Sequence, residues 1–274
     1  AYQQLIGRPL VLIAGVEGQT PQALREAELA SRLGYHAGLL SLAAMRDANT
    51  DALIAHCRAV SQIIPLFGFY LQPAVGGRVL AYEFWRRFAE IENVVAIKIA
   101  PFNRYQTIDV VRGVVESGRA GEIALYTGND DHILLDLLTP FRFPSNNRYV
   151  TAGIVGGLLG QWAVWTRRAV EMLERAHRIV ETESPIPADL MAMANELTDA
   201  NAAIFDAAHG FAGCIPGINE VLRRQGLLAS RQCLNPSEDL SPGQADEISR
   251  VHAAYPSLND DQFVAEHLDQ WLTG

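Results

Sequence analysis

The sequence predicts an α/β protein built around a parallel sheet. Over the first two thirds of the 274 residues, short apolar runs alternate with amphipathic stretches of helical length. The apolar runs are nearly continuous, which indicates strands that are buried on both faces. A doubly wound sheet and a closed barrel both fit this order. No glycine-rich phosphate loop of the GxGxxG or Walker type follows any of the runs, which weakens a nucleotide-binding interpretation.

Six apolar runs are predicted to be the strands, each bounded by residues that favour turns. In chain order they cover residues 9–16, 36–43, 65–73, 94–101, 122–130 and 150–160. The fourth run, VVAIKIAP, is typical of a buried strand because β-branched residues dominate it.

Helical patterns fill the intervals between these runs. They cover residues 20–33, 50–64, 79–91, 107–117, 131–138 and 161–180. Thr20 caps the first helix, with Pro21 in its first turn, and Asn49 or Thr50 opens the second. In the third, the apolar periodicity predicts that Phe84 and Trp85 face the core or an interface.

Beyond residue 182 the pattern is helical only. Helices are predicted over residues 186–204, 218–228, 245–254 and 261–272, with a turn-rich loop over 233–243. We therefore expect residues 1–182 to hold the strands and residues 183–274 to form a helical C-terminal region packed on them.

Composition excludes several classes of protein. A net charge of −9 argues against a long nucleic-acid surface, and the chain has no apolar run long enough to span a membrane. The opening residues lack the pattern of a signal peptide. Cys57, Cys214 and Cys233 are too widely spaced to indicate a disulfide framework or a zinc site, and the histidines show no metal-ligand spacing, so we expect no metal. A cytoplasmic location is the default expectation.

Lys98 is the most informative residue. The chain has 22 basic residues, and Lys98 is the only lysine among them. Lysine can lose its proton and form a Schiff base, whereas arginine can do neither. Strand alternation places Lys98 on one face with Val94, Ala96 and Ala100, where the alanines would leave room for a ligand. Apolar walls would favour the neutral, nucleophilic amine. A lysine that merely extends to solvent from a strand end explains the pattern equally well.

Tyr70 and Gln72 are candidates on the third predicted strand, on one face with Leu66 and Gly68. A tyrosine hydroxyl near the carboxyl end of a parallel strand is placed to relay protons to a substrate. A core tyrosine with a hydrogen-bonded hydroxyl is the more common case. Gln72, at the end of the same run, is a candidate for contacting substrate.

The segment TGNDD lies at the end of the fifth predicted strand, where polar groups could bind substrate hydroxyls. Its candidate residues are Gly128, Asn129, Asp130 and Asp131. Asn129 or Asp130 would also suit the N-cap of the following helix, and both roles can hold together. On the sixth strand, Gly157 and its neighbouring glycines permit close approach of a ligand or tight strand packing.

Taken in order, these segments resemble the dihydrodipicolinate synthase and N-acetylneuraminate lyase family of Schiff-base aldolases. FYLQPAVGG is similar to the family's Y-N-x-P-x-x-x-G segment, VVAIKIA to its G-I-K signature, and YTGNDD to its G-x-D-[DE] segment. The resemblance runs from about residue 8 to residue 228, and more weakly to residue 254. It implies a (β/α)₈ barrel with a helical C-terminal region and a site at the carboxyl ends of the strands.

By this resemblance Lys98 would form the imine and Tyr70 would assist proton transfer. Gly128, Asp130 and Asp131 would contact the substrate tail. The family implies a 2-keto acid such as pyruvate or a sugar-derived keto acid, no cofactor beyond the imine itself, no nucleic-acid or membrane partner, and a homodimer or tetramer.

The sequence also departs from the family pattern. Residues 9–16 match the family's third strand, so the first two βα units, roughly 60 residues, are expected to be absent from this sequence. The family tyrosine after the fourth strand aligns with Ala44 or Met45, and the synthase arginine aligns with Val75. Losing that arginine argues against dihydrodipicolinate synthesis itself.

Three hypotheses follow. The leading one is a class I lyase, an aldolase or dehydratase. The second is a non-catalytic protein that binds keto acids or sugar acids on an aldolase scaffold. The third, and weakest because no phosphate loop is present, is another barrel enzyme in which Lys98 binds phosphate.

Overall fold

The computed structural model describes residues 7, 9–145 and 147–273. Residues 1–6, which carry most of the opening segment used to judge a signal peptide, lie outside this range. The chain forms two compact units, one of residues 1–126 and 140–155 and the other of residues 127–139 and 156–274. The expected boundary at residue 182, between the strand-containing part and the helical C-terminal region, stays a prediction.

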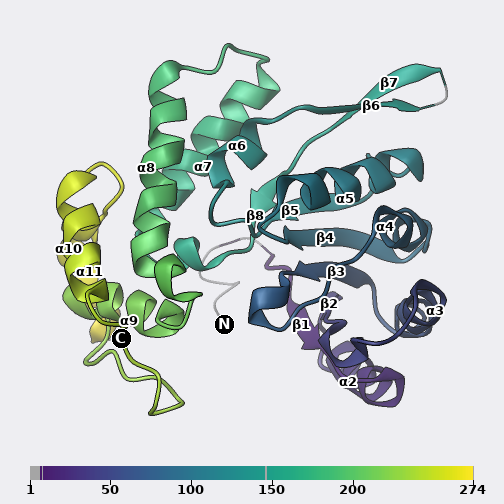
Figure 1. Ribbon diagram of the computed structural model, residues 1–274, viewed down its shortest axis with the longest axis horizontal. Helices are drawn as coiled ribbons and strands as arrows, with labels where there is room; N and C mark the ends of the chain where they lie inside the picture. The colour runs from purple at the N-terminus through teal and green to yellow at the C-terminus, as the bar shows by residue number, and fades with distance from the viewer. Residues whose placement is uncertain (1–6, 8, 146, 274) are drawn as a thin grey trace. The chain divides into compact units, whose positions relative to one another are not determined.

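Five strands of the main sheet begin in the first unit (Figure 1). They are β1 (Ile13–Val16), β2 (Ala37–Leu40), β3 (Leu66–Leu71), β4 (Val94–Ala100) and β5 (Ala124–Thr127). β1 pairs in parallel with β2, β2 with β3, and β3 with β4, as the βαβ pattern predicts. The full strand order is β1-β2-β3-β4-β5-β8, in which β8 (Gly156–Gly157) is a two-residue strand.

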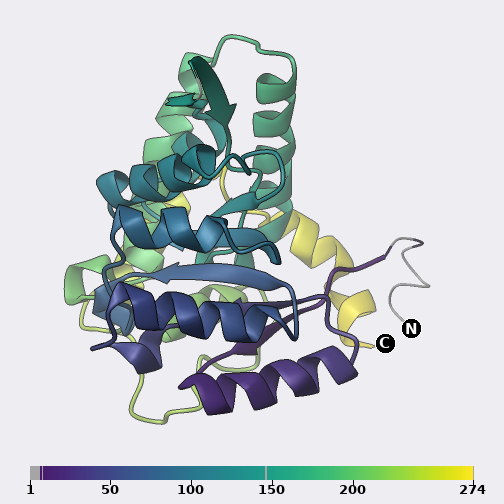
Figure 2. The same cartoon turned by 90° about the vertical axis from the view of Figure 1, so that its right-hand side faces the viewer.

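Four helices of the first unit alternate with these strands and lie along the sheet (Figures 1 and 2). They are α2 (Thr20–Arg32), α3 (Thr50–Ser61), α4 (Tyr82–Ala89) and α5 (Arg104–Glu116). Asn49 caps α3 by accepting a hydrogen bond from the backbone N–H of Ala52 (2.9 Å). On α4, Phe84 and Trp85 are each only 1% exposed, which confirms that this face packs in the core.

Residues 141–152 form a hairpin that the sequence pattern did not predict. β6 (Phe141–Ser145) and β7 (Arg148–Ala152) pair in antiparallel fashion and pack beside α5. The expected sixth strand over residues 150–160 is therefore wrong as a single element, because β7 takes its first part and β8 its later part. Only Phe141 and Ala152 are buried in these two strands, and their other residues are exposed or half-buried.

The second unit is largely helical. Its longest helices are α7 (Thr166–Glu181) and α8 (Ala188–Ile204), preceded by the short α6 (Ile133–Leu138) and by η3 (Gly160–Ala163). α9 (Cys214–Arg224), α10 (Gln244–Ala254) and α11 (Asp261–Leu272) follow. α8 packs against α6, α9 and α10, and an ion pair from Arg250 to Asp199 (2.8 Å) joins α10 to α8.

The four helices expected after residue 182 are present, and α11 has the predicted bounds. Within the described residues, no helix is long and apolar enough to cross a membrane.

Candidate active site

Lys98 lies near the carboxyl end of β4 and is half-buried. Its Nζ atom is 4.6 Å from the centroid of the Phe69 ring on β3, a cation–π contact. Ala96 and Ala100, each 4% exposed, flank Lys98 on its own strand. On the same face of β3, Phe67 packs against Tyr126 with their ring centroids 5.3 Å apart. Small and aromatic side chains are therefore among the neighbours of the amine, as the sequence predicts.

The register between β3 and β4 decides which side chain stands next to Lys98. Leu66 is opposite Val94, but Phe67 is opposite Ala96, so the register shifts by one residue at a β-bulge that skips Val95. From there on, Phe69 is opposite Lys98 and Tyr70 is opposite Ile99.

This register corrects two expectations. Because strand residues alternate between faces, Tyr70 lies on the other face of the sheet from Lys98, and the structure does not bring the two together. Strand alternation had also predicted that Val94 shares a face with Ala96, Lys98 and Ala100. The bulge after Val94 breaks this alternation, so that prediction is wrong for Val94.

Tyr70 has a different set of partners. Its side chain is fully buried, and its ring lies against Trp85 of α4 with the centroids 5.1 Å apart. The hydroxyl donates to the backbone oxygen of Leu80 and accepts from the Leu80 N–H, both at 3.2 Å. Burial raises the pKa of Tyr70 above its ordinary value. This is the hydrogen-bonded core tyrosine that the sequence left open as an alternative.

Gln72 follows the end of β3 and is 9% exposed. Its backbone oxygen accepts a hydrogen bond from Gly77 N (3.0 Å), which folds the following loop back on the strand. A contact between the Gln72 side chain and substrate stays a prediction.

The TGNDD segment, in the second unit, forms a tightly bonded strand end. Thr127 donates to the buried carboxylate of Asp136 (2.6 Å), and the Asn129 side chain donates to the same oxygen (3.0 Å). Gly128 lies buried between Thr127 and Asn129. Asn129 is therefore held by α6 through Asp136, and it supports the segment from within rather than facing solvent.

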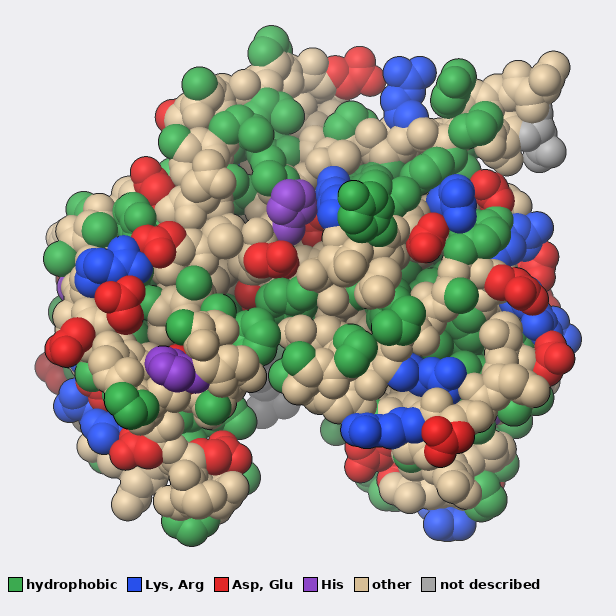
Figure 3. Space-filling view, in the orientation of Figure 1, with side chains coloured by type: hydrophobic (Ala, Val, Ile, Leu, Met, Phe, Trp, Pro, Cys, Tyr) green, Lys and Arg blue, Asp and Glu red, His purple; other side chains and the backbone are tan. Residues whose placement is uncertain are grey.

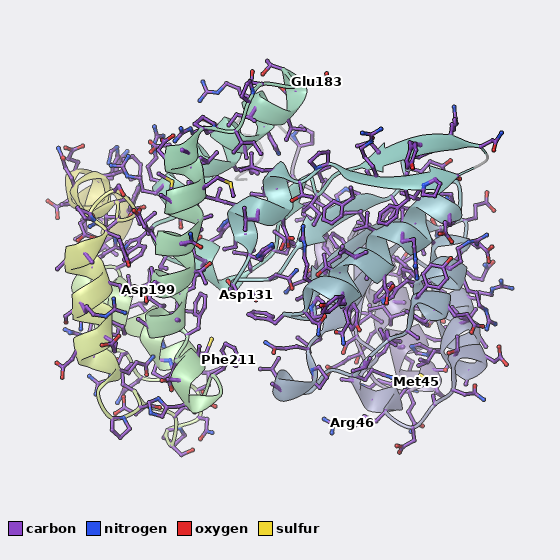
Figure 4. All side chains as sticks on the ribbon, turned by 45° about the horizontal axis from the view of Figure 1, so that its top comes forward. Met45, Arg46, Asp131, Glu183, Asp199 and Phe211 are labelled. Carbon is purple, nitrogen blue, oxygen red and sulfur yellow. The ribbon has the colours of Figure 1, made fainter. Side chains whose placement is uncertain are left out.

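Asp130 and Asp131 are held through their backbones. Asn201 donates to the Asp130 backbone oxygen (2.8 Å), and Thr198 donates to that of Asp131 (3.0 Å). The Asp130 carboxylate accepts from the backbone N–H of Gln161 (3.2 Å). The exposed Asp131, labelled in Figure 4, has its pKa raised by the desolvation of its surroundings.

Two features of the second unit bear on ligand binding. The Gln161 side chain is fully buried, and both its amide atoms lack a hydrogen-bond partner among the described residues. No pattern in the sequence had singled out this residue. Next to Gly157, an added Cβ would lie 3.0 Å from Leu159 and 3.1 Å from Trp162. This contact favours the packing interpretation of Gly157, and its role in ligand binding stays a prediction.

Charge is distributed in mixed patches. On the face drawn in Figure 3, the basic side chains stand singly or in small groups beside acidic ones. Across the described part of the chain, no group of three or more His, Cys, Asp or Glu side chains is placed to hold a metal ion.

Comparison with known proteins locates this fold. The solved dihydrodipicolinate synthase from Thermotoga maritima matches with a TM-score of 0.68 and 18% identity, covering 93% of this chain and 78% of that one. The synthase from Acinetobacter baumannii, solved in complex with pyruvate, matches with a TM-score of 0.68 and 18% identity, covering 93% and 77%. At this identity the likeness defines the fold, and it confirms the predicted class, an α/β barrel-type fold with a helical C-terminal region.

Sequence comparison is more specific but covers less of the chain. A 4-hydroxy-tetrahydrodipicolinate synthase from Cyanothece sp. is 32% identical over 139 residues, which is 50% of this chain and 45% of that protein. The enzyme from Acaryochloris marina is 28% identical over 179 residues, 61% of this chain and 58% of that protein. The chain thus spans about half the length of the curated relatives it matches. No family model matches it. The chain is a divergent relative of the dihydrodipicolinate synthases, and the predicted resemblance is confirmed.

Proposed function

We propose that the protein is a Schiff-base-forming lyase, an aldolase or dehydratase, that acts on a 2-keto acid such as pyruvate or a sugar-derived keto acid. The observation that carries the proposal is the position of Lys98, the chain's only lysine, half-buried near the carboxyl end of a parallel strand. Ligands of parallel α/β sheets bind at this end of the strands. The synthase from Acinetobacter baumannii, which has a similar fold, was solved in complex with pyruvate, and this supports a keto acid as the ligand.

In the proposed reaction the neutral amine of Lys98 attacks the keto carbon, the hydroxyl of the resulting carbinolamine takes up a proton from solvent, and water leaves, which forms an iminium. The iminium then accepts the electron pair released when a carbon–carbon bond breaks or when a β-proton is removed before water elimination. Attack requires the neutral amine, and the side chains of Phe69, Ala96 and Ala100 are the apolar neighbours of Lys98. No metal or organic cofactor enters these steps.

Proton transfer needs a group other than Tyr70. The neighbour of Lys98 on β3 is Phe69, which carries no exchangeable proton, while the Tyr70 hydroxyl is bonded to Leu80. We therefore assign to Lys98 the catalytic role and to Tyr70 a positioning role. Gln72, Gly128, Asn129, Asp130, Asp131 and Gly157 stay proposed contacts for the substrate tail.

The test is reductive trapping. The protein is incubated with pyruvate and with longer 2-keto acids, reduced with borohydride, and mapped by peptide mass. We expect an adduct on the peptide that contains Lys98, and none after Lys98→Arg, because arginine cannot form the imine. The absence of an adduct with every keto acid would overturn the proposal.

A non-catalytic binding protein is the second candidate, and the Phe69 contact favours it, because an ammonium group held over an aromatic ring can bind an acid without forming an imine. In that case Lys98→Arg should retain keto-acid affinity in calorimetry, since the positive charge is kept. A lyase should lose all turnover in the same variant. Calorimetry and borohydride trapping with pyruvate separate the candidates without knowledge of the natural substrate.

A further inference from the structure

A small pocket in the first unit opens beside the carboxyl ends of β2 and β3. Residues from three segments line it: the loop after β2, strand β3, and the loop after β3. They are Ser41, Leu42, Ala43, Phe69, Leu71, Gly77, Arg78 and Leu80. The site residues expected from the sequence include none of these. The pocket is nevertheless at the end of the sheet where ligands of parallel α/β folds bind.

Phe69 connects this pocket to the amine. Its ring is in contact with Lys98 Nζ, and the same side chain lines the pocket. A ligand joined to Lys98 as an imine has its carboxylate on the carbon that bears the imine nitrogen. A carboxylate anchor for such a ligand must therefore lie near the amine, and Phe69 is the side chain that the amine and this pocket have in common.

The loop over residues 72–80 is held in a fixed conformation against β3. A Cβ added to Gly77 would lie 1.9 Å from the backbone oxygen of Leu71, so only glycine allows this close approach. At the far end of the loop, the Tyr70 hydroxyl bonds both the N–H and the carbonyl oxygen of Leu80. Arg78 lies between these two fixed points.

The guanidinium of Arg78 is positioned but has donors left. Its Nη1 donates to the backbone oxygen of Met45 in η1 (Ala43–Met45), the short helix labelled at Met45 and Arg46 in Figure 4. Its Nε is buried and has no hydrogen-bond partner among the described residues. A guanidinium presents five N–H donors in a planar fork that matches a carboxylate. A fixed cation with spare donors at a pocket wall is suited to bind an acid.

We propose that Arg78 binds the carboxylate of the 2-keto acid whose keto carbon reacts with Lys98. The proposal deepens the proposed function and rests on it for the identity of the ligand. It assigns the recognition of the acid to the loop after β3, and it gives the Tyr70–Leu80 contact a purpose, since that contact fixes the loop that carries Arg78. The rival explanation is that Arg78 only ties this loop to η1 through Met45.

The experiment compares an acid with its neutral ester. Wild type, Arg78→Gln and Arg46→Gln are treated with increasing pyruvate or methyl pyruvate, reduced with borohydride, and scored for adduct on the Lys98 peptide. Arg46→Gln is the matched control, because Arg46 is exposed on the neighbouring turn and does not line the pocket. Unfolding of each variant in urea checks that the fold is retained.

We expect Arg78→Gln to raise the pyruvate concentration needed for half-maximal labelling on the order of tenfold to a hundredfold, the value of a charge-assisted hydrogen-bonded pair. Labelling by methyl pyruvate should stay within about twofold of wild type, and Arg46→Gln should match wild type with both compounds. An equal loss with the acid and the ester, or no loss with either, would overturn the proposal and leave Arg78 as a structural tie.

Failure of the proposed function gives a different result. If no carbonyl compound labels wild type, pyruvate binding is measured by calorimetry on wild type and Arg78→Gln. Binding that is lost only in Arg78→Gln would support Arg78 as a carboxylate anchor in a protein that forms no imine. Binding that is equal in the two proteins, or missing from wild type, would overturn the assignment of Arg78 as well.

Discussion

The two faces of the β3–β4 pair differ in composition, in burial and in what they can do. One face carries Phe69 and the half-buried Lys98. The other carries Tyr70 and Ile99, both fully buried, with Tyr70 against Trp85 of α4. Tyr70 and Phe69 are neighbours in sequence, yet one contacts a helix and the other a reactive amine. The face of the sheet that a residue occupies, and not its distance along the strand from a site residue, therefore decides whether it can belong to the site.

The contrast also separates stability from chemistry. The helix-covered face contributes aromatic packing among Tyr70, Trp85 and Phe88, whose ring centroids lie within 6 Å along this series. The Lys98 face leaves an amine half-buried, which costs stability but allows reaction. Changes on the two faces should consequently move different observables, and the following substitutions test that division.

The largest effect on stability is expected from Trp85→Ala. Trp85 is 1% exposed, and its removal leaves a cavity under β3, which should lower the free energy of unfolding by about 3–5 kcal/mol. Urea denaturation measures the loss. At low temperature, where the variant is folded, labelling of Lys98 should be retained. Tyr105→Ala is the control, because Tyr105 is 83% exposed and its loss should change stability by less than about 0.5 kcal/mol.

A smaller effect is expected from Tyr70→Phe. The substitution keeps the ring against Trp85 but removes the hydroxyl from the buried N–H and carbonyl of Leu80, which should cost about 1–2 kcal/mol in urea denaturation. Saturating pyruvate should still label Lys98 in borohydride trapping. Loss of labelling with stability intact would place Tyr70 beside the amine after all, and would refute the division between the faces.

The smallest effect concerns pH. Burial raises the folded-state pKa of Tyr70 above its ordinary value of 10.0, so the unfolded phenol ionises first as pH rises. Below about pH 10 the phenol is neutral in both states and the free energy of unfolding is unaffected. Above it, the unfolded chain gains stability by ionising, so the free energy of unfolding falls as pH rises. From about pH 9 to pH 11, wild type should lose up to about 1 kcal/mol more than Tyr70→Phe. Urea denaturation of the pair at several pH values measures this gap. A gap that stays constant would mean that the phenol ionises as if exposed.

Much of the fold could be predicted from the sequence, because strong patterns determine it locally. β4 and α11 have almost the expected bounds, since a β-branched run and an amphipathic period each specify one structure. The β6–β7 hairpin was missed for a different reason. The apolar run over residues 150–160 was expected to be one strand, whereas its first part belongs to β7, which pairs with β6.

The candidate site was harder to predict than the fold. Lys98 stood out because of its chemistry and its position in an apolar run, which are visible in one sequence. Its neighbour was not visible, because alternation within β3 says which residues share a face but not which face meets Lys98. Arg78 gave no signal, since the sequence does not show how the loop around Gly77 folds back on Leu71.

The bulge at Val95 has a consequence for how such proteins diverge. Continuing the pairing of Leu66 with Val94 without a shift would set Tyr70 opposite Lys98, and the one skipped residue sets Phe69 there instead. One extra residue in β4, rather than a substitution, therefore decides whether Lys98 has tyrosine or phenylalanine opposite it. Two chains can keep the same lysine and the same tyrosine in alignment and still present different chemistry, and an inventory of matched residues would score them as equal.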